Sequence, residues 1–122
     1  MYQITKQFKF SAGHFLESLP DSHPCARQHG HNYLVDIGLQ SEHLNNIGFV
    51  VDYGDLVGFK DMIDSTLDHK NLNDVVTFNP TAELLANYLF ERCAEFWWGA
   101  KVISVSVKET DGTSAVYYQN IH

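Results

Sequence analysis

The sequence predicts an α+β fold in which a four-stranded antiparallel sheet carries two helices on one of its faces. Apolar and polar side chains alternate over residues 2–10 and 31–40, as they do in half-buried strands. Apolar residues then recur at helical spacing in two successive segments, and strand-like alternation returns near the C-terminus. The resulting order β-β-α-α-β-β contains two hairpins and two helices, which favours a sheet covered by one helical layer.

The first two predicted strands flank a long loop. Residues 2–10 place apolar side chains on one face, namely Tyr2, Ile4, Phe8 and Phe10. Residues 11–28 are rich in Gly, Ser, Pro and Asp, so we expect them to form the loop. Residues 31–40 carry an apolar row formed by Tyr33, Val35, Ile37 and Leu39. The histidines at positions 29 and 31 are in phase with this row.

Two helices are expected next. Asp52 is a suitable cap for a helix over residues 54–67, whose apolar stripe is Leu56, Phe59, Ile63 and Leu67. Asn79 is expected to cap the second helix and Pro80 to occupy its first position, where the missing N–H costs nothing. The apolar stripe of this helix comprises Leu84, Leu85, Tyr88, Leu89, Cys93 and Phe96. Gly99 is a suitable stop.

The C-terminal part of the chain predicts a hairpin. Residues 102–110 are expected to form the third strand, Asp111-Gly112 the turn and residues 114–121 the last strand. The chain has 122 residues and is 44% hydrophobic, so we expect one compact domain over residues 1–122.

Composition narrows the class of protein. A formal net charge of -7 argues against nucleic acid as a partner, because phosphate contacts need clustered Lys and Arg. No apolar run is long enough for a membrane span, and the N-terminus lacks an apolar signal region. The two cysteines, Cys25 and Cys93, are interpreted as reduced thiols of a cytoplasmic protein, with Cys93 in the core. A small anionic substrate remains compatible with an acidic chain.

The most informative motif is His29-Gly30-His31, which follows Cys25 after a gap of three residues. Histidines at i and i+2 on a strand point to the same face, and glycine between them permits close approach of backbone or ligand. With His14, they form a candidate three-histidine metal site. Three protein ligands and an open fourth position are typical of catalytic zinc. Cys25 is then interpreted as an acid/base or nucleophile beside the metal.

Two acidic motifs have both structural and functional interpretations. Glu109 continues the apolar face of its strand, so it is either an exposed strand end or a buried, partnered carboxylate. In the second case it could accept two N–H bonds from a planar heterocycle such as a pterin ring. Asp68 precedes His69, and such a pair either orients the imidazole or forms a solvated helix end. Arg27 is either a phosphate contact or a solvated loop charge.

Together these motifs resemble the 6-pyruvoyltetrahydropterin synthase/6-carboxytetrahydropterin synthase family. The resemblance covers nearly the whole chain in order. It rests on Ala12-Gly13-His14, Cys25-x-x-x-His29-Gly-His31-Asn32-Tyr33, Leu67-Asp68-His69 with Leu72-Asn73, Asn79-Pro80-Thr81-x-Glu83 and Val107-Lys108-Glu109-Thr110. It implies the tunnelling fold, in which subunit sheets join into a barrel. It also implies homo-oligomers, trimers or dimers of trimers, with active sites between subunits.

The resemblance also implies a role for each motif. His14, His29 and His31 correspond to Zn²⁺ ligands, Cys25 to a general base and Asp68-His69 to a proton-relaying pair. Glu109 corresponds to the pterin anchor, and Thr81 to a further pterin contact. The three-residue gap after Cys25 resembles the bacterial carboxy-forming branch of queuosine and 7-deazapurine biosynthesis. That branch converts 7,8-dihydroneopterin triphosphate to 6-carboxy-5,6,7,8-tetrahydropterin, acetaldehyde and triphosphate.

Three alternatives remain open at this stage. A pyruvoyl-forming synthase or related pterin side-chain lyase would give a different product, although pyruvoyl-forming enzymes typically have a longer gap. A zinc hydrolase would use a metal-bound hydroxide and would leave Cys25, Asp68-His69 and Glu109 without roles. A non-catalytic zinc protein would close the fourth metal position, with Cys25 as the most plausible ligand.

Overall fold

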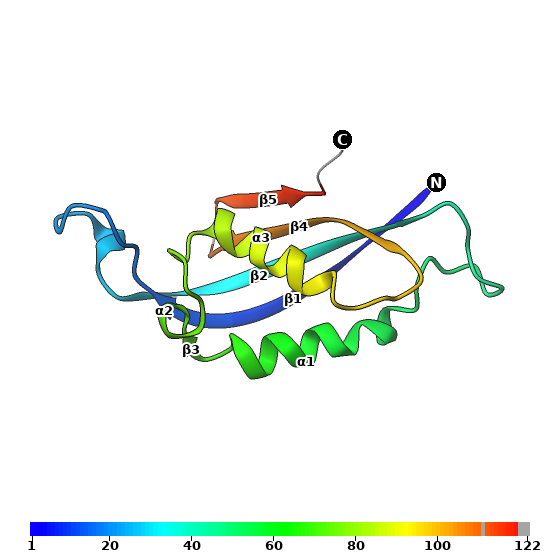
Figure 1. The fold of residues 1–122 in the computed structure, drawn as a ribbon, viewed down its shortest axis with the longest axis horizontal. Helices are drawn as coiled ribbons and strands as arrows, with labels where there is room; N and C mark the ends of the chain where they lie inside the picture. Colours follow the sequence, from blue (N-terminus) through cyan, green and yellow to red (C-terminus); the bar gives the residue numbers. More distant parts are fainter. Residues whose placement is uncertain (111, 120–122) are drawn as a thin grey trace.

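A computed structural model describes residues 1–110 and 112–119 of the chain. Within these residues, a five-stranded sheet has the order β3-β1-β2-β4-β5 (Figure 1). The strands are β1 (Tyr2–His14), β2 (His29–Ser41), β3 (Lys70–Asn71), β4 (Lys101–Glu109) and β5 (Ser114–Tyr118). The α-helices are α1 (Val57–Thr66), α2 (Leu72–Val75) and α3 (Ala82–Cys93). Short 3₁₀ turns precede β2 and α1, namely η1 (Pro24–Ala26) and η2 (Tyr53–Leu56).

The predicted α+β architecture, with the long helices on one face of the sheet, is confirmed. Figure 1 shows α3 lying across β2 and β4 while α1 runs alongside β1. One hydrophobic core joins both helices to the same strand faces. Its strand residues include Phe8, Phe10, Tyr33, Val35, Ile37, Leu39, Val105 and Val107, and its helix residues include Phe59, Ile63, Leu85 and Leu89. Alternation predicted these strand rows, except that Tyr2, placed in the row of the first strand, is 52% exposed.

The first hairpin is longer than predicted. The loop expected over residues 11–28 is wrong at its N-terminal end, because residues 11–14 belong to β1, and the second strand begins two residues earlier than predicted. β1 continues to His14 and β2 begins at His29, with His14 opposite His29 and Ala12 opposite His31. The buried row of β1 continues through Phe10, Ala12 and His14, so the small residues extend the ladder. His14 therefore lies on a strand, almost fully buried, and not in a loop.

The predicted count of four strands is also wrong. β3 adds a fifth strand that pairs in parallel with β1, at Ala12 and Gly13. A strand of two residues has no room to display alternation, so sequence periodicity could not reveal it. The helical turn α2 follows β3 directly and was missed for the same reason.

The helix boundaries differ from the predictions at the N-terminal caps. Asp52 does cap the first helical turn, by accepting a hydrogen bond from the Gly54 N–H at 2.9 Å, but that turn is 3₁₀. Asn79 does not cap α3. Thr81 does so, because its hydroxyl accepts from the Leu84 N–H at 3.2 Å. The Asn79 side-chain oxygen instead accepts from the Glu17 N–H at 2.9 Å.

The second helix ends earlier than predicted, and its buried stripe is narrower. α3 ends at Cys93, well before Gly99. Leu84 is 43% exposed and does not belong to the buried stripe, which Leu85, Ala86, Leu89 and Cys93 form. In the described part of the chain, no helix is long and apolar enough to cross a membrane.

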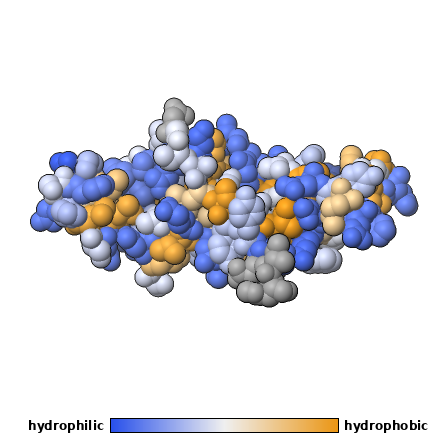
Figure 2. All heavy atoms as spheres, turned by 90° about the horizontal axis from the view of Figure 1, so that it is seen from above, coloured by the Kyte–Doolittle hydropathy of each residue, from blue (hydrophilic) through white to orange (hydrophobic). Residues whose placement is uncertain are grey.

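The C-terminal hairpin is confirmed in outline. β4 and β5 pair antiparallel, and Gly112 has a φ of 99°, which suits glycine in a turn. Thr110 was predicted as the last residue of the third strand but lies just beyond β4. Asp111 of the predicted turn, and residues 120–121 of the predicted last strand, lie outside the described residues. Figure 2 shows that polar side chains cover much of one surface of this elongated molecule, interrupted by smaller apolar patches.

Candidate metal centre and adjoining groups

The three predicted histidines converge at one end of the β1–β2 hairpin. One nitrogen of each ring belongs to a group whose members all lie within 4.8 Å of one another. The Nε2 atoms of His14 and His29 are 3.0 Å apart, and the ring centroids of His29 and His31 are 4.8 Å apart. His14 comes from β1 and the other two come from β2, so the antiparallel register brings them together. Spacing along the sequence had correctly placed His29 and His31 on one face.

The second ring nitrogen of each histidine is held by an oxygen atom. His14 Nδ1 lies 2.8 Å from the carbonyl of Pro80, and His29 Nδ1 lies 2.7 Å from the carbonyl of Arg27. His31 Nδ1 lies 3.0 Å from the Thr110 hydroxyl. A carbonyl can only accept, so Nδ1 carries the proton in His14 and His29. Their Nε2 atoms are left with a free lone pair, as metal ligation requires.

The surroundings of His14 and His31 favour their neutral forms. Burial lowers the pKa of His14, assisted by the neighbouring rings, although the Pro80 carbonyl opposes the shift. Burial also lowers the pKa of His31, and the nearby Glu109 carboxylate partly opposes it. A neutral imidazole is the form that binds a divalent metal. The donor set therefore fits Zn²⁺ and related ions, because such nitrogens suit Zn, Cu, Fe and Ni.

Glu109 lies directly beside the histidine cluster. Its Oε2 atom is 3.5 Å from His31 Nε2, and its side chain is 22% exposed. It follows the buried Val105 and Val107 on the same face of β4, so it ends the apolar row rather than standing in open solvent. Glu109 and Thr81 also line a cavity of about 550 Å³, which is within the range of small-ligand pockets.

Asp68 and His69 are in contact, as the sequence suggested. His69 Nδ1 lies 2.8 Å from Asp68 Oδ2, and the His69 side chain is 82% exposed. Asp68 Oδ1 accepts a hydrogen bond from the Ser11 N–H at 2.9 Å, and this bond is the main cause of the lowered pKa of the Asp68 carboxyl. The His69 N–H in turn donates to the Ser11 carbonyl at 2.6 Å. The pair therefore fastens the end of α1 to β1.

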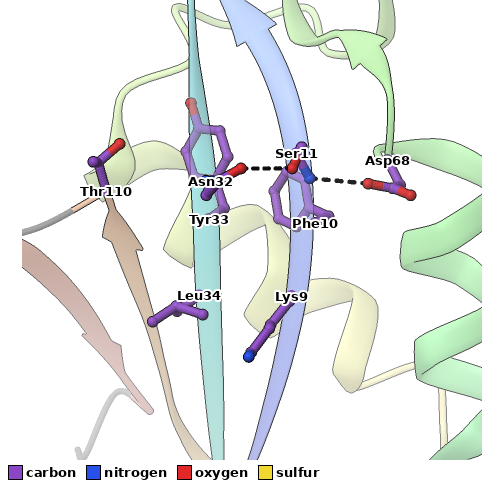
Figure 3. A pocket seen from close by; sticks show the side chains of 8 residues that line it. All are labelled: Lys9, Phe10, Ser11, Asn32, Tyr33, Leu34, Asp68 and Thr110. Atoms are coloured by element: carbon purple, nitrogen blue, oxygen red, sulfur yellow. Dashed lines mark hydrogen bonds between the residues drawn. The ribbon is translucent and has the colours of Figure 1, made fainter.

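The Asp68 carboxylate borders a cavity on the outer face of the sheet. Figure 3 shows Asp68, Ser11 and Asn32 beside this cavity, whose volume is about 480 Å³. The Ser11 hydroxyl donates to Asn32 Oδ1 at 2.7 Å. Ser11 and Asn32 alternate with the buried Phe10 and Tyr33, so the cavity opens away from the helices. A neighbouring cavity of about 580 Å³ is bordered by His69, His31 and Thr110, among others.

Cys25 lies apart from these groups. It sits in η1, on the loop between β1 and β2, as a half-buried free thiol. Its sulfur does not belong to the cluster of potential ligand atoms found among the described residues, so nothing in that cluster supports Cys25 as a closing fourth ligand. It also does not line either cavity that Asp68 or His69 borders. Arg27 has an exposed side chain, and its carbonyl is the part that contacts His29.

Sequence reasoning missed four partners of the histidines, namely Pro80, Arg27, Tyr33 and Thr110. The Pro80 and Arg27 carbonyls carry no side-chain signal, so no residue pattern could identify them. The Tyr33 hydroxyl lies 3.3 Å from His14 Nδ1, and burial raises the pKa of this phenol. Thr110 had a sequence signal, since it directly follows Glu109.

The fold and the cluster together define a class: an α+β sheet protein with three convergent histidines at the end of its first hairpin. The family described as 6-pyruvoyl tetrahydropterin synthase matches residues 3–120. The chain therefore belongs to the 6-pyruvoyl tetrahydropterin synthase family and has the tunnelling fold of that family. Family membership confirms the resemblance on which the sequence interpretation depended.

Individual relatives carry two kinds of name. The 6-carboxy-5,6,7,8-tetrahydropterin synthase of Synechocystis is 32% identical to this chain. The match covers 97% of this chain and 94% of the relative. The human 6-pyruvoyl tetrahydrobiopterin synthase is 31% identical, covering 94% of this chain and 90% of its own. The solved 6-pyruvoyl tetrahydropterin synthase of Caenorhabditis elegans has a TM-score of 0.85 and 28% identity, over 98% of this chain and 96% of that one. These names support a pterin synthase.

Proposed function

We propose that this protein is a zinc-dependent 6-carboxy-5,6,7,8-tetrahydropterin synthase, a carbon–carbon lyase of queuosine and 7-deazapurine biosynthesis. Its substrate would be 7,8-dihydroneopterin triphosphate, and its products 6-carboxytetrahydropterin, acetaldehyde and triphosphate. The observation that carries the proposal is the convergence of three oriented imidazoles next to Glu109 in a pterin synthase fold. The name of the Synechocystis relative, 6-carboxy-5,6,7,8-tetrahydropterin synthase, supports the carboxy-forming branch.

His14, His29 and His31 would hold the metal through their Nε2 atoms, since their Nδ1 atoms have oxygen partners. When bound, Zn²⁺ supplies Lewis-acid polarisation of the substrate side-chain oxygens. Burial of His14 keeps its imidazole neutral and excludes water from one side of the centre. The chain thus provides a preformed ligand set.

Glu109 would anchor the pterin ring by accepting two of its N–H groups. Its carboxylate borders the cavity that also reaches Thr81 at the start of α3. Thr81 would add a contact to the ring, and Arg27 would meet the triphosphate from the exposed loop. An analogue without the pterin N–H donors would leave the half-buried carboxylate unpaired, which disfavours its binding.

Cys25 would take a proton from the carbon next to the pterin ring, and His69, held by Asp68, would exchange protons in the later steps. The Asp68–His69 contact of 2.8 Å supports an oriented imidazole. Cys25 and His69 border different regions of one chain, which supports active sites built at interfaces of a homo-oligomer. We further propose that residues 1–122 act as a single domain in the cytoplasm.

Product identification tests this function directly. Purified protein with measured zinc content is incubated with dihydroneopterin triphosphate, and the products are identified by mass. We expect 6-carboxytetrahydropterin with equimolar acetaldehyde and triphosphate. A 6-pyruvoyl product without acetaldehyde would instead establish the pyruvoyl-forming reaction, the second candidate, which the human relative favours. Absence of any pterin turnover by the zinc-loaded protein would overturn both.

A further inference from the structure

Thr110 has a backbone conformation that its side chain disfavours. Its φ is 52°, in the left-handed region, and threonine is branched at Cβ. A β-branched residue is a genuine outlier there, and such conformations cost free energy. Glycine would fit the position without strain. Such strain persists only where other contacts hold the residue in place, and Thr110 has such contacts.

The unusual φ lets two consecutive residues contact one imidazole. In a regular strand, Glu109 and Thr110 would point to opposite faces. Here Glu109 Oε2 lies 3.5 Å from His31 Nε2, and the Thr110 hydroxyl lies 3.0 Å from His31 Nδ1. The Thr110 N–H donates to the Asn32 carbonyl at 2.9 Å, which fixes the turn beside the residue that follows His31. The backbone thus delivers the hydroxyl to the ring.

We infer that Thr110 is a positioning residue for the metal centre, whose hydroxyl accepts the Nδ1 proton of His31 and so directs His31 Nε2 to the metal. This inference rests on the proposed metal site. At His14 and His29, backbone carbonyls accept the Nδ1 proton in the same way. His31 has no backbone carbonyl at its Nδ1 among its contacts in the described part of the chain, so the Thr110 hydroxyl can be removed by substitution without altering the main chain.

The role also couples two parts of the proposed site. Glu109, the proposed pterin anchor, is covalently next to Thr110, and both contact His31. The end of β4 therefore contacts His31 through two consecutive side chains. The strain at Thr110 is the feature that allows this double contact.

The test compares Thr110→Val, which keeps the shape and removes the hydroxyl, with Thr110→Ser, which keeps the hydroxyl. Zn²⁺ affinity is measured by competition with a chromophoric chelator, and Co²⁺ binding by its visible absorption. We expect Thr110→Val to weaken Zn²⁺ binding about 10- to 100-fold, the usual cost of losing such a partner, and to alter the Co²⁺ spectrum. Thr110→Ser should stay within about threefold of wild type. Thr77→Val, at an exposed position, serves as the control.

Thr110→Gly separates the hydroxyl from the backbone. It relieves the left-handed strain, so we expect the metal-free variant to fold while Zn²⁺ binding still weakens about 10- to 100-fold. Retention of wild-type Zn²⁺ affinity by both the Val and the Gly variants would overturn the role of Thr110. Failure of the wild-type protein itself to bind Zn²⁺ or Co²⁺ would overturn the metal site, and this role with it.

Discussion

The two ring nitrogens of each histidine in the cluster have different neighbours. Nδ1 lies next to a protein oxygen in all three rings, and the Nε2 atoms of His14 and His29 lie 3.0 Å apart. This difference matters because an imidazole that binds a metal must present a lone pair rather than a proton. For His14 and His29 the backbone carbonyls therefore fix the tautomer before any ligand binds, so binding does not require the ring to reorient.

Replacement of Cys25 by alanine tests its proposed role as the general base. Cys25→Ala should retain Zn²⁺, because the thiol is not part of the histidine cluster. Turnover of dihydroneopterin triphosphate should fall about 10²- to 10⁴-fold, the usual contribution of a general base. Zinc content and acetaldehyde release are measured on the same sample. Undiminished acetaldehyde release would remove Cys25 from the mechanism, and Ser22→Ala in the same exposed loop serves as the control.

The elements of the fold show where prediction from sequence succeeds. Alternation identified the buried rows of β1, β2 and β4 because long half-buried strands repeat the signal many times. It failed at residues 11–14, where Gly and Ser suggested a loop although the backbone continues the ladder opposite β2. It also failed for β3, which owes its existence to a parallel contact with β1. Such contacts are tertiary, so the local sequence does not encode them.

The candidate site, like the fold, could be predicted from the sequence only in part. The convergence of the three histidines and the Asp68–His69 contact followed from spacing and residue type. The carbonyl partners of the imidazoles did not. The caps of α3 illustrate the limit: Asn79 and Thr81 are both suitable capping residues. The choice depends on the loop after β1, whose Glu17 N–H engages the Asn79 side chain.

The cap of α3 leads to a prediction about stability. Thr81→Ala removes the hydroxyl that accepts from the Leu84 N–H, so the free energy of unfolding should fall by about 1 kcal/mol. Thr81→Ser retains the hydroxyl and should lose much less. Urea unfolding followed by circular dichroism measures both variants. Thr77→Ala, at an exposed position outside the helix, is the control, and an equal loss there would contradict the capping role.

The joint between α1 and β1 predicts a pH dependence of stability. The pKa of Asp68 is lowered in the folded protein, chiefly by the Ser11 N–H, so the unfolded state binds more protons as the pH falls. The stabilisation is therefore fully present above the ordinary Asp pKa of 3.8 and is lost as the pH falls below that pKa. We expect the free energy of unfolding of Asp68→Asn to be lower than that of wild type at pH 7. This difference should shrink as the pH is lowered to about 3. Urea unfolding at each pH measures the difference, and Asp61→Asn, at an exposed position, is the control.

The whole molecule exposes features that favour assembly. Within the described residues, β1 has a strand neighbour on its outer side only at Ala12 and Gly13. β5 forms the other edge of the sheet. Open edges offer unpaired backbone groups to another chain. The proposed catalytic groups are also separated within one chain, since Cys25 lies in the β1–β2 loop while Asp68 and His69 lie at the β1–β3 edge.

This separation predicts complementation between inactive variants. If one site takes Cys25 from one subunit and His69 from another, oligomers co-assembled from Cys25→Ala and His69→Ala chains contain some sites with both groups intact. With equal random mixing, roughly a quarter of the sites are intact, so turnover should recover to about a quarter of wild type. Mixing Cys25→Ala with the Cys25→Ala/His69→Ala double variant provides no intact thiol and should recover nothing. Mixed oligomers no more active than either variant alone would mean that both groups act within one chain.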